Sequence, residues 1–215
     1  MTCSLCETRR AKRACPGVRG TICPRCCGEE REVTIDCPFD CAYLQESRRH
    51  ETPAAKPGEA VPDADIRITE SWLRDHHMLL LTLASALFST AMENGRTVDR
   101  DVREALEALS KTYRTLQSGL YYESVPANPY AAQLYQRAQE AIAAFRREET
   151  ERGGMSVTRD TDILGCIAFW RRMEYTTDNG RARCRAFLDF LRAQLEGFGA
   201  TAPGAEAARS PLVLP

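Results

Sequence analysis

The sequence predicts a mainly α protein, in which a small two-zinc, cysteine-rich module with a short β-hairpin is linked to an all-α bundle of about five helices. Three observations support this prediction. Eight of the ten cysteines lie within the first 41 residues. A stretch rich in proline and alanine follows at residues 47–64. Residues 65–198 then show apolar side chains at helical spacing, interrupted by short polar turns.

The cysteines of the module, residues 1–46, have the spacing of metal ligands. They are Cys3, Cys6, Cys15, Cys23, Cys26, Cys27, Cys37 and Cys41. Four thiolates in a tetrahedron are the usual ligands of a structural zinc ion, so eight thiolates predict two Zn²⁺ ions. Disulfides and an iron–sulfur cluster are the alternatives. Because no apolar stretch precedes Cys3, we expect a cytoplasmic protein whose thiols stay reduced.

The ligands divide into two sets if each C-x2-C turn directs both of its thiolates at one ion. The first set is then Cys3, Cys6, Cys23 and Cys26. The second set is Cys15, Cys27, Cys37 and Cys41. Exchange of Cys26 and Cys27 between the sets fits the spacing equally well, and His50 is not needed as a ligand. A module of this size buries too little apolar surface to fold alone, so we expect metal binding and folding to form one equilibrium.

Local patterns predict the secondary structure of the module. Residues 31–36 alternate between polar and apolar side chains, which indicates a short strand, and residues 18–22 are its expected antiparallel partner. Residues 37–44 are typical of a turn that opens a short helix, and we expect Cys37 and Cys41 to lie on its first turn.

Apolar periodicity predicts the helices of the bundle. The first begins near Ile66 or Thr69 and ends at Glu93, and its apolar part is shorter than the roughly 20 residues that a membrane span needs. The second is capped by Thr97 and ends before Ser124. The third begins at Asn128–Pro129 and ends at Gly153–Gly154. The last two cover residues 160–175 and 181–198, and we expect disorder in the tail at residues 199–215.

The cysteine pattern resembles a known signature. The segments Ile22–Gly28, Arg31 and Cys37–Leu44 match the form I-C-P-x-C-C-G, R and C-P-x-D-C-x-Y-L. This resembles the amino terminus of an uncharacterised bacterial family in which a cysteine-rich module precedes a helical domain, and the helical part of the chain is similar too. The resemblance implies zinc and no known activity. A weaker likeness to HIT and MYND zinc fingers implies protein interaction. This chain has a lone Cys15 where those fingers carry a pair, and it lacks their closing His-x3-Cys.

No pattern in the sequence indicates catalysis, so we do not expect an enzyme. Neighbouring residues of a helix point about 100° apart, so His76 and His77 do not converge on one ion. Cys166 and Cys184 lie in apolar surroundings and are expected to be buried free thiols. The segment Tyr121–Glu123 is expected to end a helix and to pack its aromatic rings on the next one. Phosphate-binding loops and nucleophile motifs are absent from the sequence.

These observations predict a non-catalytic zinc-binding protein with an adaptor role and a protein partner. One alternative is a nucleic-acid-binding regulator that uses the basic loop Arg9–Arg13, and another is a redox sensor based on zinc thiolates. The net charge of −1 excludes a basic field over the whole molecule. Residues 1–50 hold nine basic and seven acidic side chains. The sequence predicts no membrane partner and does not predict an oligomeric state.

Overall fold

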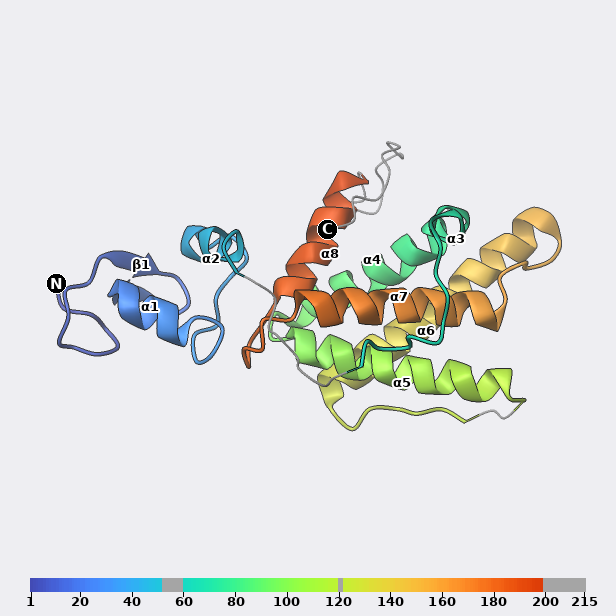
Figure 1. Cartoon of the computed structure of the whole chain (residues 1–215), viewed down its shortest axis with the longest axis horizontal. Coiled ribbons are helices and arrows are strands. Elements are labelled where there is room, and N and C mark those ends of the chain that lie inside the picture. Colours follow the sequence, from blue (N-terminus) through green and yellow to red (C-terminus); the bar gives the residue numbers. More distant parts are fainter. Residues whose placement is uncertain (52–59, 120–121, 199–215) are drawn as a thin grey trace.

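The structure is a computed structural model that describes residues 1–51, 60–119 and 122–198 (Figure 1). It is mainly helical, with a two-stranded hairpin beside the N-terminal cysteines. Figure 1 shows the N-terminal module at one end of the molecule and the helical bundle at the other. The predicted tail, residues 52–59 of the predicted linker, and Leu120 and Tyr121 lie outside the described residues. None of the described helices is long and apolar enough to cross a membrane.

The module contains two short strands and two short helices. Its elements are β1 (Arg13–Cys15), β2 (Gly20–Ile22), α1 (Pro24–Glu30) and α2 (Ala42–Arg48). The strands are antiparallel, with Arg13 opposite Ile22 and Cys15 opposite Gly20. The turn between them packs closely on the chain before Cys37, because a Cβ on Gly17 would lie 2.6 Å from a backbone oxygen there. Cys41 is the N-cap residue of α2, so Cys37 lies before this helix and not on its first turn as expected.

The predicted strand at residues 31–36 is wrong, because β2 pairs with β1. The segment folds as a tight turn in which the backbone N–H groups of Val33, Thr34 and Ile35 donate to the carbonyl of Glu30 at 3.0–3.1 Å. Glu32 has a left-handed backbone with φ of 51°, which a β-ladder does not accommodate. The alternation in the sequence reflects a turn that buries Ile35 and exposes Val33.

The bundle contains all the predicted helices, with the first one divided. Its elements are α3 (Glu70–Asp75), α4 (His77–Asn94), α5 (Asp99–Gln117), α6 (Pro129–Gly153), α7 (Asp160–Thr177) and α8 (Ala186–Gly197). The break between α3 and α4 falls at His76, whose ring stacks on Trp72 with centroids 4.3 Å apart. Helix α6 begins as predicted: the Asn128 side chain accepts a hydrogen bond from the N–H of Tyr130 at 3.0 Å, and Pro129 occupies the first turn.

Two helix starts differ from the prediction. Val98 and not Thr97 precedes α5, and the N–H of Val98 donates to the Asp101 carboxylate at 3.0 Å. Helix α8 begins at Ala186, five residues later than expected. The reason is Asp99, whose buried carboxylate accepts the N–H groups of Phe187 and Leu188 at 2.9 and 3.1 Å and so fixes the first turn of α8.

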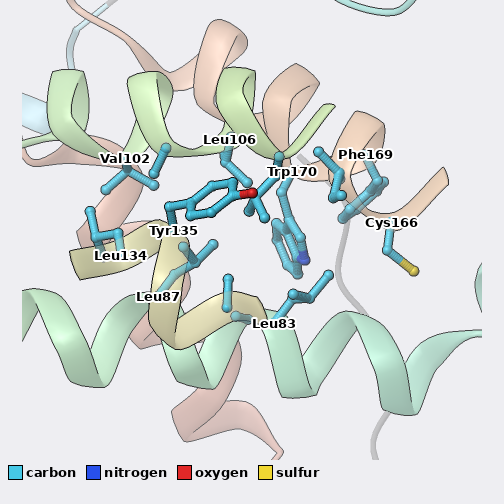
Figure 2. Packing of buried hydrophobic residues seen from close by; sticks show 14 of the residues in the cluster. Leu83, Leu87, Val102, Leu106, Leu134, Tyr135, Cys166, Phe169 and Trp170 are labelled. Carbon is cyan, nitrogen blue, oxygen red and sulfur yellow. The ribbon is translucent and has the colours of Figure 1, made fainter. Parts of the chain in front are cut away.

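The bundle has a continuous apolar core (Figure 2). Leu83 and Leu87 of α4 face Leu106 of α5, with the rings of Tyr135 and Trp170 between the helices. The Trp170 indole donates to a carbonyl of α4 at 3.2 Å, and the Tyr135 hydroxyl lies 3.1 Å from a threonine hydroxyl of α5. Each fully buried large side chain contributes about 1.5–3 kcal/mol, so this core can support the bundle independently of the module.

Buried charge joins the module to the bundle. The Glu32 side chain is 1% exposed, and one of its oxygens accepts from Arg48 at 2.8 Å and from the N–H of Arg185 at 3.1 Å. Its other oxygen accepts from Asn179 at 3.0 Å. Arg48 also pairs with Asp189 of α8. These contacts hold the module against the loop before α8 and the first turns of that helix.

The end of the predicted linker is fixed to the bundle by Asp63. Its buried carboxylate accepts from Arg114 at 2.7 Å, from Arg171 at 2.5 Å and from Ser110 at 3.1 Å. Burial opposes ionisation of this group, but the bonds from Arg114 and Arg171 hold the pKa of Asp63 below its ordinary value. Arg172 donates to the backbone carbonyl of Asp63.

We expect Gly165→Ala to lower the free energy of unfolding by about 1–3 kcal/mol. A Cβ at this position in α7 would lie 2.5 Å from the indole of Trp72, so either the ring or the helix must move. Gly153→Ala at the end of α6 is the matched control, because a Cβ there meets nothing within 4 Å. Urea denaturation followed by circular dichroism measures both. Equal effects of the two substitutions would contradict the close contact.

Candidate metal centre

Four cysteines of the module come together at one point. The Sγ atoms of Cys3, Cys6, Cys23 and Cys26 all lie within 4.8 Å of one another. In a zinc tetrahedron with Zn–S bonds of about 2.3 Å, the sulfurs are about 3.8 Å apart. Small side-chain movements therefore bring the four sulfurs to the spacing that one zinc ion requires.

Two short turns create this arrangement. In the first, the carbonyl of Cys3 accepts the N–H of Glu7 at 2.8 Å, which curls the chain so that Cys3 and Cys6 face the same point. In the second, Cys23 is the N-cap residue of α1, and its Sγ accepts the N–H of Cys26 at 3.4 Å. The N–H of Cys23 donates to the Cys3 sulfur at 3.2 Å, which joins the two turns. Such N–H donors favour the thiolate form that binds metal.

The electrostatics of the four thiols are uneven. The Thr8 hydroxyl, with the backbone N–H groups of Arg9 and Thr8, lowers the pKa of Cys6 to about 5. Burial raises the pKa of Cys26 to about 12, and the neighbouring thiols Cys23, Cys6 and Cys3 add to the effect. The crowding that penalises a charge on Cys26 is what a divalent cation offsets, because it supplies the opposite charge at the centre of the cluster.

Arg9 supports the cluster from outside the ligand set. Its guanidinium lies 3.8 Å from the Cys23 sulfur, which is within hydrogen-bonding range of a sulfur acceptor. A cation in this position stabilises thiolate charge and shields it from solvent. In the sequence, Arg9 is one of the cations of the basic loop Arg9–Arg13. The spacing of the cysteines contains no signal that would single it out from Arg10 or Lys12.

The other four cysteines surround a second point. Cys15 at the end of β1, Cys27 in α1, Cys37 and Cys41 line one cavity of about 10 Å³. The apolar side chains of this cavity are Ile22, Ile35 and Leu44. Within the described residues, only the first set draws its sulfurs within 4.8 Å of one another. Burial raises the pKa of the Cys37 thiol to about 11, and the charges on Cys41 and Glu32 raise it further.

The structure thus confirms one four-cysteine cluster that can hold a metal, and a donor set of four sulfurs is typical of zinc. It places Cys26 in this cluster and Cys27 at the second cavity, which corresponds to the first of the two assignments that the spacing allows. All ten cysteines are free thiols in the structure.

Comparison with known proteins finds no matching protein family, no curated relative and no matching solved structure. The chain shows an N-terminal four-cysteine cluster followed by a helical region, and no family is identified.

The remaining cysteines, the histidine pair and the tyrosine segment that the sequence analysis names lie apart from the metal cluster. Cys166 and Cys184 are buried, as expected, and burial raises the pKa of both thiols. His76 contacts Asp162 at 3.4 Å, and His77 is exposed. Tyr122 is 67% exposed, so the expected packing of this ring on the next helix is wrong.

Proposed function

We propose that this chain is a non-catalytic zinc protein of the bacterial cytoplasm, in which two ions shape an adaptor module that recognises another macromolecule. The observation that carries the proposal is the closed cluster of Cys3, Cys6, Cys23 and Cys26. Catalytic zinc keeps one coordination position open for water or substrate, whereas structural zinc is enclosed by four protein ligands. A cluster of four cysteines fits the structural class.

The second ion of the proposal is held by Cys15, Cys27, Cys37 and Cys41. These residues come from four different places in the module and line the same cavity, whose volume of about 10 Å³ suits a single small ligand. Adjacent Cys26 and Cys27 would then connect the two sites through α1. We expect metal binding at the second site to bring its four sulfurs to the spacing of a zinc tetrahedron, because ligation and local folding are coupled.

Attachment of the module to the bundle supports an adaptor role. Arg48 of the module pairs with Asp189 of α8, and Arg185 of the bundle pairs with Asp36 of the module at 3.0 Å. Arg181 donates to the backbone carbonyls of Gly28 at 3.2 Å and Arg31 at 2.5 Å. Such contacts hold the two parts in a fixed orientation, so the module presents a fixed surface to a partner.

Native mass spectrometry of protein purified without chelators tests the metal count. We expect two zinc ions per chain, and one ion after Cys37→Ser or Cys15→Ser, because serine is a poor zinc ligand. Cys166→Ser is the matched control. This thiol is buried in the bundle and away from both sets, so the variant is expected to keep two ions. A wild-type chain with one ion that is unchanged in Cys37→Ser would overturn the second site.

A further inference from the structure

The segment from Arg9 to Arg19 carries an unusual concentration of positive charge. It contains Arg9, Arg10, Lys12, Arg13 and Arg19 and no acidic residue. It forms the chain before β1, the strand itself and the turn to β2. Figure 1 shows β1 in the module, which lies at the end of the molecule opposite the bundle. The charge therefore gathers at one end of a molecule whose net charge is only −1.

Four of these cations, Arg10, Lys12, Arg13 and Arg19, make no ion pair with an acidic side chain among the described residues. Several arginines of the bundle do have a carboxylate partner, and Arg103, for example, pairs with Glu174 at 2.7 Å. A surface of unpaired cations is the electrostatic signature of a partner that is itself an anion.

The acidic side chains of the module do not offset this surface. Glu32 is buried against the bundle, and Asp36 pairs with Arg185. Two filled zinc sites would add a formal charge of about −4, since four thiolates outweigh each divalent ion. That charge lies on inward sulfurs, and Arg9 is the basic side chain that donates to one of them. The other four cations remain available to an external ligand.

One of these cations also belongs to an aromatic platform. The Arg13 guanidinium lies 4.6 Å from the centre of the Tyr43 ring, which projects from α2 and is 36% exposed. Aromatic rings and guanidinium planes are the groups on which unpaired bases stack, while nearby cations follow the phosphates. Stacking of this kind favours a single strand over a duplex, because the bases of a duplex are already stacked on one another.

We propose that residues 9–19 together with Tyr43 form a binding surface for single-stranded nucleic acid. Arg10, Lys12 and Arg19 contact phosphates, and the Arg13–Tyr43 pair stacks on a base. The proposal deepens the proposed function by naming the partner of the metal module, and it rests on that function because the cysteines at both ends of the hairpin hold it in place.

Fluorescence anisotropy of the full-length, zinc-loaded protein with a short labelled oligouridine RNA and the matching oligothymidine DNA tests this surface. We expect binding at low salt that weakens as salt rises, with a slope of about 0.7 per phosphate contact. The variant Arg10→Gln/Lys12→Gln/Arg19→Gln is expected to bind at least tenfold more weakly with a shallower slope. Tyr43→Ala is expected to weaken binding about fivefold or more and to keep the slope.

The matched control is Arg49→Gln/Arg74→Gln/Arg152→Gln, which removes the same charge from exposed arginines outside the segment. It is expected to bind within about twofold of wild type. If both triple variants lose affinity for the oligonucleotide equally, net charge alone explains the loss and the proposed surface is wrong. Tighter binding of duplex DNA, or binding of polyglutamate and no oligonucleotide, would overturn the single-stranded partner. If every variant carries two zinc ions but the wild-type protein binds neither oligonucleotide, this inference is wrong and the metal proposal stands.

Discussion

Cys23→Ser is expected to remove the first metal site and unfold the hairpin of the module. Cys23 is both a ligand and the residue before α1, and its sulfur accepts bonds from the N–H of Cys26 and from Arg9. Structural zinc contributes about 10–16 kcal/mol of binding free energy in small modules, so loss of one thiolate exceeds what the few buried side chains of the module supply. The bundle is expected to stay folded because it has its own core.

Two measurements check this expectation. Native mass spectrometry should show loss of at least one zinc ion, and hydrogen exchange should show loss of protection in β1, β2 and α1, with protection in α4–α7 retained. Cys184→Ser is the control for removal of a buried thiol, because Cys184 lies in the bundle outside both ligand sets. Protection of β1 and β2 in a Cys23→Ser protein that has lost its metal would show that the module folds without zinc.

Glu32→Gln is expected to lower the free energy of unfolding by about 3 kcal/mol and to loosen the module from the bundle. The substitution keeps the shape of the side chain and removes the buried charge that faces Arg48. Removing one partner of a buried ion pair costs about 3–5 kcal/mol, and the lower value applies because Arg48 keeps its bond to Asp189.

Chemical denaturation measures the stability change, and hydrogen exchange at the amide of Arg185 reports the contact directly, because this N–H donates to Glu32 at 3.1 Å. Glu46→Gln is the matched control: Glu46 is 61% exposed and pairs with Arg49 on the surface, where such pairs contribute about 0–1 kcal/mol. If the two variants have equal stability and equal exchange at Arg185, Glu32 does not join the parts of the molecule.

Much of the architecture follows from local chemistry. Cysteine spacing is enough to group Cys3, Cys6, Cys23 and Cys26, because each C-x2-C turn is closed by bonds within a few residues. The start of α6 follows from Asn128 and Pro129, whose effects are also local. The apolar spacing of the bundle helices likewise depends on each helix alone.

The features that the sequence does not predict depend on distant residues. The break at His76 accompanies stacking on Trp72, and Trp72 in turn covers Gly165 in another helix. Residues 31–36 alternate as a strand does, but the backbone turns at Glu32 to present its carboxylate to α8 and the loop before it. Arg9 is one of several similar cations until the fold brings it to Cys23. Contacts between residues so far apart in the sequence can be identified only from the tertiary structure.

The chain is fixed to the bundle at Glu51 and again at Asp63. Glu51 accepts a bond from Asn179 at 3.3 Å, and Asp63 is held by Arg114 and Arg171. Noncovalent contacts thus fix both positions, and lengthening a connection between two fixed points costs only about 0.6 kcal/mol for each doubling. The geometry between module and bundle is therefore independent of linker length, and a single backbone cut there leaves the two halves attached to each other.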